Sequence, residues 1–399
     1  MSDRAVNLDH AATTPLRPEA LEAMLPFLRD GVGNPSGSHA LARAARRALD
    51  EARESLADTL GAAPGDVVFT SGGTEADNLA LAGPVRAAEA AGIDRPIVVG
   101  TAVEHPAVRE TVAALGGWAA PVRRDGVVDL GALERLVVDA GERLVVVSVM
   151  LVNNETGVIE PVRDVVALVR EAARSDALVH SDAVQGFVWC DVRRDAAGAD
   201  LLSLSAHKFG GPQGMGALAV LAGARKRLRP LLNGGPQEGE LRAGTENVAG
   251  AVGMAVAARL THEERAEARR RADELGDRLV AGLCALGGIE PAVGRARRIG
   301  AICNVRVREV AAEELLLLLD RLGVYASAGS ACASGALEPS PVLSAMGVER
   351  SASREHVRFS LGYESTAADV DRALAAVSEA LGRLRGTTGC AAGRAAPAP

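Results

Sequence analysis

Short apolar runs alternate with helix-like stretches through the first half of the chain, and this alternation constrains the fold more than any other feature. Runs typical of buried strands lie at 67–70, 96–100, 144–149 and 177–180, and another begins at 199. Stretches with a helical spacing of charges, such as 40–60 and 161–174, separate them. Strands joined through helices pair in parallel by right-handed crossovers. We therefore predict an α/β fold with a mostly parallel sheet.

Polar residues follow these strands, at the edge of a parallel sheet where ligands bind. Gly72, Gly73 and Thr74 come directly after the strand at 67–70 and open a helix, whose free N–H groups and dipole favour an anion. This turn indicates a phosphate site, although a plain capped turn has the same pattern. His105 and Asp182 follow two other strands, and a lone histidine in such a place is more often a capping or packing residue.

Lys208 follows the strand that begins at 199, and Ser205 and His207 precede it by a few positions. A glycine-rich turn comes next. No aspartate, glutamate or arginine and no second lysine lies within seven positions of Lys208. An isolated amine at the end of a strand suits a Schiff-base lysine. A surface lysine beside a tight turn remains the alternative on these residues alone.

Asp182 lies 26 residues before Lys208 and one strand earlier. A pyridoxal phosphate site needs an amine, a carboxylate that keeps the ring nitrogen protonated, a phosphate cradle and a flat group against the ring. Lys208, Asp182, the turn at 72–74 with Ser205 and His207, and His105 supply all four. Their joint occurrence favours this cofactor over separate structural roles for each residue.

The second half of the chain indicates a smaller α/β domain. A polar insert at 231–247, expected to be flexible, leads into a long helical region near 248–286. A strand at 301–307, a helix at 311–322 and a strand at 357–361 follow, and the last strand carries Arg358 on the face opposite Val357 and Phe359. We expect a large cofactor-binding domain over 15–250, a small domain over 1–14 and 251–385, and a disordered tail over 386–399.

Composition excludes several classes of protein. A formal net charge of −7 without a basic tract argues against nucleic-acid binding, and no apolar run is long enough to span a membrane. The start of the chain lacks the apolar core of a signal peptide, so a cytoplasmic location is expected. The 5 cysteines have no spacing typical of a disulfide framework or a metal site. Cys332 alone lies among small polar residues, in a loop near 325–340 that carries the thiol in an accessible setting.

Taken together, these motifs resemble those of the cysteine desulfurases, pyridoxal-phosphate enzymes of the aminotransferase class V group, from about residue 7 to 365. The resemblance lies in motifs that occur in the family's order, at 8–15, 70–78, 104–108, 153–157, 181–185, 206–208, 234–247 and 329–335. The sequence Gly329-Ser-Ala-Cys332 is similar to that of the branch with a long cysteine loop. The resemblance implies the transferase fold type I of pyridoxal-phosphate enzymes.

The resemblance also implies roles for individual residues. Lys208 would bind the cofactor covalently, Asp182 would pair with the ring nitrogen, and His105 would stack on the ring and assist proton transfer. The remaining cofactor contacts would come from Gly73, Thr74, Asn154, Gln185, Ser205, His207 and, across a homodimer interface, Thr245. The substrate carboxylate would be held by Asn34, Asn154 and Arg358. Cys332 would take the sulfur.

The implied reaction converts L-cysteine to L-alanine and leaves a persulfide on Cys332 for delivery to an acceptor protein, in iron-sulfur assembly or thiolation. Selenocysteine lyase or cysteine C–S lyase chemistry on the same fold is one alternative, and a non-catalytic sulfur-transfer scaffold is another. Pro236 and Pro341 depart from residues common in the family. Neither removes a catalytic group, but both alter the loops that carry the insert and the cysteine.

Overall fold

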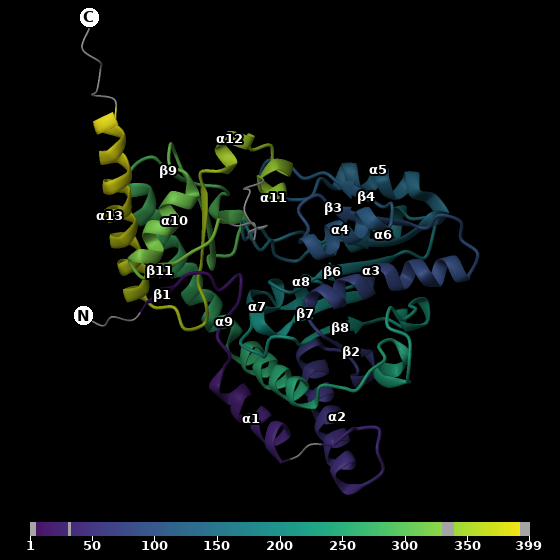
Figure 1. Ribbon diagram of the computed structural model, residues 1–399. Helices are drawn as coiled ribbons and strands as arrows, with labels where there is room; N and C mark the ends of the chain where they lie inside the picture. Colours follow the sequence, from purple (N-terminus) through teal and green to yellow (C-terminus); the bar gives the residue numbers. More distant parts are fainter. Residues whose placement is uncertain (1–4, 31–32, 329–338, 392–399) are drawn as a thin grey trace, which may run out of the picture. The chain divides into compact units, whose positions relative to one another are not determined.

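A computed structural model describes residues 5–30, 33–328 and 339–391. The chain divides into two compact units, each described here by itself (Figure 1). The large unit comprises Thr13–Asn153 and Ile159–Glu267, and the small unit comprises Met1–Ala12, Asn154–Val158 and Ala268–Pro399. Cys332, the predicted sulfur-accepting residue, lies outside the described residues.

The large unit is built on a 7-stranded sheet with the strand order β2-β8-β7-β6-β5-β3-β4. Its strands are β2 (Val67–Thr70), β3 (Ile97–Thr101), β4 (Trp118–Ala120), β5 (Leu144–Ser148), β6 (Leu178–Asp182), β7 (Leu201–Ser205) and β8 (Gly216–Val220). Strand β8 runs antiparallel to both of its neighbours, and the other pairs are parallel. The predicted mostly parallel sheet is thus confirmed, while β8 and β4 were not predicted.

Helices surround this sheet in the large unit (Figure 1). They are α1 (Pro18–Arg29), α2 (Ala40–Leu60), α3 (Gly73–Ala90), α4 (Pro106–Ala114), α5 (Leu130–Ala140), α6 (Val162–Ala172), α7 (Gly186–Trp189) and α8 (Val192–Asp195). Ala76, Leu79 and Ala80 of α3 pack in one buried cluster with residues of β2, β3, β5, β6, β7 and β8. Helix α3 therefore covers one face of the sheet, and its N-terminus lies at the carboxyl end of β2.

The polar insert at 231–247 is not the flexible segment that its composition predicted. Glu238 is buried, receives two hydrogen bonds from Arg53 at 2.7 Å each, and accepts a third from the backbone of Phe69. Arg242 donates to Glu75 in the first turn of α3 at 2.8 Å. Charged side chains of the insert therefore attach it to α2, β2 and α3.

The small unit contains two separate groups of strands. Strands β9 (Ile289–Pro291), β10 (Ile302–Val307) and β12 (His356–Ser360) form an antiparallel sheet, and β1 (Val6–Asn7) pairs in parallel with β11 (Val324–Tyr325). Leucine, valine and alanine side chains of α10 (Ala312–Arg321) and α13 (Ala367–Ala391) share one core with these strands. Two short helices, α11 (Pro341–Ala345) and α12 (Arg350–Ser353), precede β12, and the long helix α9 (Val248–Ala285) has residues in both units.

Helix α13 continues to Ala391, past residue 385 where the small domain was expected to end. Once a helix is nucleated and packed at its first turns, as α13 is through Val370, Ala373 and Val377, adding further residues costs little. Within the described parts of the chain, no helix has the length and apolar character needed to cross a membrane.

Candidate active site

One face of the large sheet changes from apolar to polar toward the carboxyl ends of its central strands. Alternate residues of a strand share a face, so each strand can bury an apolar residue first and present a polar one next. The series are Val146 then Ser148 on β5, Leu178 then His180 and Asp182 on β6, and Leu201 then Ser203 and Ser205 on β7. All of these residues are buried. A polar site is thus built beneath the N-terminal part of α3.

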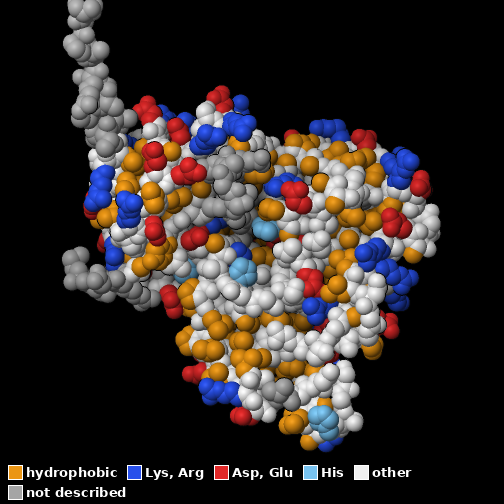
Figure 2. Space-filling model, in the orientation of Figure 1, with side chains coloured by type: hydrophobic (Ala, Val, Ile, Leu, Met, Phe, Trp, Pro, Cys, Tyr) orange, Lys and Arg blue, Asp and Glu red, His pale blue; other side chains and the backbone are white. Residues whose placement is uncertain are grey.

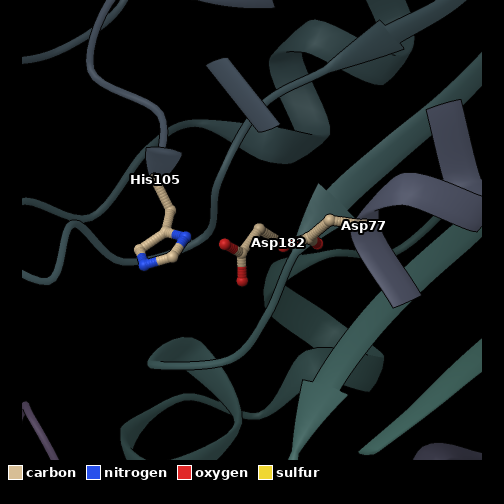
Figure 3. A group of neighbouring side chains, drawn as sticks. All are labelled: Asp77, His105 and Asp182. Carbon is tan, nitrogen blue, oxygen red and sulfur yellow. The ribbon is translucent and has the colours of Figure 1, made fainter. Parts of the chain in front are cut away.

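Asp182, the last residue of β6, is the centre of this site. One of its carboxylate oxygens accepts a hydrogen bond from the backbone of Val184 at 2.9 Å. Single donor or acceptor atoms of Asp182, His105 and Asp77 all lie within 4.8 Å of one another, and Figure 3 shows the His105 ring directed toward the Asp182 carboxylate. Burial raises the pKa of Asp182, while His105, the Val184 N–H and Lys208 oppose that rise. Burial has the largest effect, so the pKa of Asp182 lies above its ordinary value, and the charge of Lys208 limits that rise.

His105 combines the capping role and the site role that its sequence position left open. It is the N-cap of α4, and its Nδ1 accepts a hydrogen bond from the backbone of Ala107 at 3.1 Å. Burial lowers the pKa of His105, and Lys208 acts in the same direction, against the charge of Asp182. The ring is therefore held neutral near pH 7, with Nδ1 as the acceptor and the proton on Nε2.

Lys208 lies in a short turn, Ala206–Lys208, that follows β7 directly. Its side chain is half-buried, and its charge acts on both His105 and Asp182. Since β6 and β7 are adjacent parallel strands, the two strand ends bring Lys208 and Asp182 to the same edge of the sheet. The sequence analysis expected these two residues to share one site, and the strands that carry them end side by side.

The turn after β2 has the close packing that a phosphate cradle needs. A Cβ atom on Gly73 would approach Cβ of Ser205 to 3.2 Å and Cγ2 of Val184 to 2.9 Å, so only glycine fits here without movement. Gly73 begins the 18-residue helix α3, whose first N–H groups have no carbonyl partner within the helix. Thr74, which follows Gly73, is exposed in the first turn of α3, whereas Ser205 on β7 is buried.

The other predicted contacts in the large unit have different degrees of exposure. His207 is half-buried, its Nδ1 lies 3.1 Å from the Thr13 hydroxyl, and burial together with Lys208 lowers its pKa to about 4. Gln185 is buried at the start of α7. Asn34 and Thr245 are exposed, and the side-chain oxygen of Asn34 accepts a hydrogen bond from the backbone of Ser36.

Two predicted substrate-binding residues lie together in the small unit. Arg358 on β12 is buried and donates to the backbone carbonyl of Asn154 at 2.9 Å and to Asp9 at 2.7 Å. The Arg358 side chain was expected on the face of β12 opposite its apolar residues. Every residue of this strand is buried, so both of its faces are shielded from solvent. Two of its donors already have protein acceptors, which fixes the guanidinium plane.

Sequence reasoning missed three buried groups next to Asp182. Asp77 lies on α3, Glu104 precedes His105, and His180 lies two residues before Asp182 on the same strand face. Glu104 accepts hydrogen bonds from Thr101 at 2.8 Å and from the backbone of Met150 at 3.0 Å, and burial raises its pKa to about 8. The available signal was periodicity, because His180 is an i, i+2 neighbour of Asp182 and Asp77 directly follows Ala76 on the buried side of α3.

Comparison with known proteins places the whole chain in one family. The Aminotransferase class-V family matches residues 6–373. "Cysteine desulfurase IscS" of Methanosarcina thermophila is 40% identical over 96% of this chain and 93% of that protein, and the "IscS-like cysteine desulfurase" of Mycobacterium tuberculosis is 40% identical over 97% and 98%. A solved "NIFS-like protein" has a TM-score of 0.86 at 34% identity, covering 95% of this chain and 100% of that one. The chain therefore belongs to the aminotransferase class-V family, among its cysteine desulfurases.

Proposed function

We propose that the protein converts L-cysteine to L-alanine with pyridoxal phosphate and transfers the sulfur to Cys332. The activity follows from membership among the cysteine desulfurases at 40% identity over nearly the full length of the chain. The observation that supports the cofactor is the buried Asp182 carboxylate, whose charge interacts with both His105 and Lys208 at one edge of the sheet. The same site with a different acceptor would give C–S lyase or selenocysteine lyase chemistry.

The residues of the large unit fit this cofactor. Asp182 has one oxygen fixed by Val184 and would hold a protonated ring nitrogen, a cation that compensates its burial. Gly73 lets the N-terminus of α3 pack closely against Ser205, and a phosphate dianion would be bound at this N-terminus. Further contacts would come from Thr74, Asn154, Gln185, His207 and Thr245. When bound, the cofactor would withdraw electrons from the substrate and so make its α-proton acidic.

Lys208 and His105 are positioned to move protons. Lys208 would hold the cofactor in the resting enzyme and act as a free amine once substrate has replaced it. His105 would lie against the ring, and its neutral state leaves the imidazole able to take a proton. Both groups lie at the same edge as Asp182, so a proton removed from the substrate has an acceptor within the site.

Cys332 would complete the reaction as its thiolate. Its sulfur would attack the substrate sulfur, forming an S–S bond while the substrate C–S bond breaks and its electrons return to the carbon skeleton. A proton then reaches that carbon, so that L-cysteine and one enzyme thiol yield L-alanine and one enzyme persulfide, without an external oxidant. Cys303 is unsuited to this role, because it is buried and its burial raises its pKa to about 11.

Arg358 would bind the substrate carboxylate, assisted by Asn154 and Asn34. Its guanidinium plane is fixed by Asp9 and by the Asn154 carbonyl, which reduces the entropy lost when a carboxylate is bound. An arginine fork matches a carboxylate in two parallel hydrogen bonds. This contact would select an amino acid over a simple thiol.

We further propose a homodimer in which Thr245 contributes to the partner's cofactor site. Exposed leucines on the first two helices support a protein contact: Leu21 and Leu28 on α1 are 44% and 56% exposed, and Leu41 on α2 is 51% exposed. Figure 2 shows hydrophobic side chains gathered over the region of α1. Thr245 is exposed next to Glu246, which Arg46 holds at 3.3 Å, so the segment presents Thr245 outward.

The direct test is to purify the protein, reconstitute it with pyridoxal phosphate and measure alanine formed from L-cysteine. Wild type should carry the visible absorbance of a lysine-bound cofactor, and Lys208→Ala should lose both this absorbance and alanine formation while keeping its circular dichroism spectrum. A wild type that binds no cofactor after reconstitution would contradict the proposal. The acceptor that takes the sulfur is a separate question, answered by identifying which protein receives labelled sulfur.

A further inference from the structure

Asp77 is a carboxyl group that the proposed chemistry does not use, yet it lies directly behind Asp182. Asp77 is 1% exposed, and one of its oxygens, Oδ1, has no hydrogen-bond partner among the residues that the structure describes. Figure 3 shows Asp77 on the side of Asp182 away from His105. Burying an ionised carboxylate requires a cation or several donors, since otherwise its lost hydration is not replaced.

Asp77 has no such compensation among the described residues. The one ion-pair geometry it forms is with His180, whose Nε2 lies 3.6 Å from Oδ1, and burial lowers the pKa of His180 to about 3. The other charged groups facing it are acidic: Asp182 from β6 and Glu104 from the turn before α4. Lys208 and His105, the groups that favour a charged carboxylate here, act on Asp182 instead.

A chain of buried side chains leads away from Asp77. Burial and the charge of Asp182 raise the pKa of Asp77, and an interaction with Ser203 opposes this rise. The Ser203 hydroxyl lies 2.9 Å from Nε2 of His180, and Nδ1 of His180 lies 2.9 Å from the Ser148 hydroxyl. If Asp77 carries a proton, it donates to Ser203, Ser203 donates to His180, and His180 donates to Ser148. Each of these three donated hydrogens then has an acceptor, and His180 stays neutral.

We propose that Asp77 is a positioning residue that remains protonated behind Asp182 and confines the negative charge of the site to the Asp182 carboxylate. This inference rests on the proposed function in one respect, that Asp182 binds the ring nitrogen of the cofactor. Two ionised carboxylates so close together would repel each other, and Asp182 would then take up a proton and lose its interaction with the ring. A neutral Asp77 avoids this and, through Ser203, anchors the strand that precedes Lys208.

Infrared spectroscopy of the protein without cofactor tests the protonation directly. The infrared spectrum of wild type minus that of Asp77→Asn should show the carbonyl stretch of a protonated carboxylic acid. Labelling aspartate with carbon-13 should shift that band, which distinguishes it from the bands of Glu104 and Glu160. Glu75→Gln is the matched control on the same helix, because Glu75 is paired with Arg242 and should contribute carboxylate bands only. A difference spectrum with carboxylate bands alone at Asp77 would overturn the proposal.

Cofactor titration tests the positioning role. Asp77→Asn keeps a neutral group that can both donate and accept, so its dissociation constant for pyridoxal phosphate should stay within about 3-fold of wild type from pH 6 to 9. Asp77→Ala removes the interaction with Ser203 and should weaken binding by about 10-fold or more. If Asp77→Asn weakens cofactor binding as much as Asp77→Ala does, a negative charge is required at this position. If Asp77→Ala binds the cofactor like wild type, Asp77 has no positioning role. Failure of wild type to bind cofactor would contradict the proposed function, while the infrared result would still decide the state of Asp77.

Discussion

The guanidinium of Arg358 donates to the carboxylate of Asp9 at 2.7 Å, joining two residues that are 349 positions apart in the sequence. The Arg358 side chain is 4% exposed and that of Asp9 is 28% exposed, so the pair is partly shielded from water. A second donor of Arg358 reaches the carbonyl of Asn154 at 2.9 Å. These contacts fix the orientation of the one arginine that we assign to the substrate carboxylate.

This geometry predicts that Arg358→Lys raises KM for L-cysteine by about 10- to 100-fold, the cost of one or two charged hydrogen bonds. A lysine has the same charge but cannot reach Asp9, the Asn154 carbonyl and a carboxylate at once. Cofactor absorbance should be unchanged and kcat should fall much less than KM rises. Arg306→Lys on the neighbouring strand β10, whose partner is Glu355, serves as the control. Equal changes in KM for the two variants would show that Arg358 does not bind substrate.

The sequence allowed the sheet edge to be predicted because each strand is a short apolar run with a polar residue at its end. Asp182 and Lys208 could be assigned to one site since consecutive parallel strands end at the same edge. The direction of β8 could not be predicted, because the apolar run Gly216–Val220 is equally compatible with a parallel or antiparallel strand. Asp77 was overlooked because an aspartate followed by Asn78 is typical of an exposed helix face, and only the packing of α3 on the sheet shows it to be buried.

The proposed homodimer predicts that Leu28→Glu weakens self-association by about 10-fold or more, because a carboxylate would be buried against an apolar partner surface. Leu28 on α1 is 56% exposed in the single chain, so its replacement should leave the fold of that chain intact. Leu317→Glu on α10, at a position 55% exposed in the small unit, is the matched control. In sedimentation experiments, Leu28→Glu should show a fraction of monomer that increases on dilution, and Leu317→Glu should sediment like wild type. A monomeric and fully active wild type would instead contradict both the dimer and the role of Thr245.

Glu160 predicts a pH dependence of stability. Its Oε2 accepts a hydrogen bond from the backbone of Val128 at 2.9 Å, and its Oε1 has no hydrogen-bond partner in the described parts of the chain. Burial raises the pKa of Glu160 to about 8 from an ordinary value of 4.5. Between these values the folded protein keeps the proton and the unfolded chain releases it, so stability falls as pH rises. Relative to wild type, Glu160→Gln should gain up to about 1.4 kcal/mol of unfolding free energy per pH unit in this window. Denaturant unfolding at several pH values measures it, and a constant difference from pH 5 to 8 would show that Glu160 is ionised in the folded protein.

Cys332 distinguishes a desulfurase from other chemistry at the same cofactor, and mass spectrometry tests its role most directly. After wild type is treated with L-cysteine, the peptide containing Cys332 should carry one additional sulfur that a reductant removes, while peptides with Cys190, Cys284 and Cys303 should carry none. Cys332→Ala should still bind cofactor and exchange the α-proton of L-cysteine with solvent, because those steps use Lys208, His105 and Asp182. It should form no persulfide and almost no alanine. If Cys332→Ala instead produces alanine and sulfide at the wild-type rate, the enzyme is a lyase and Cys332 does not accept the sulfur.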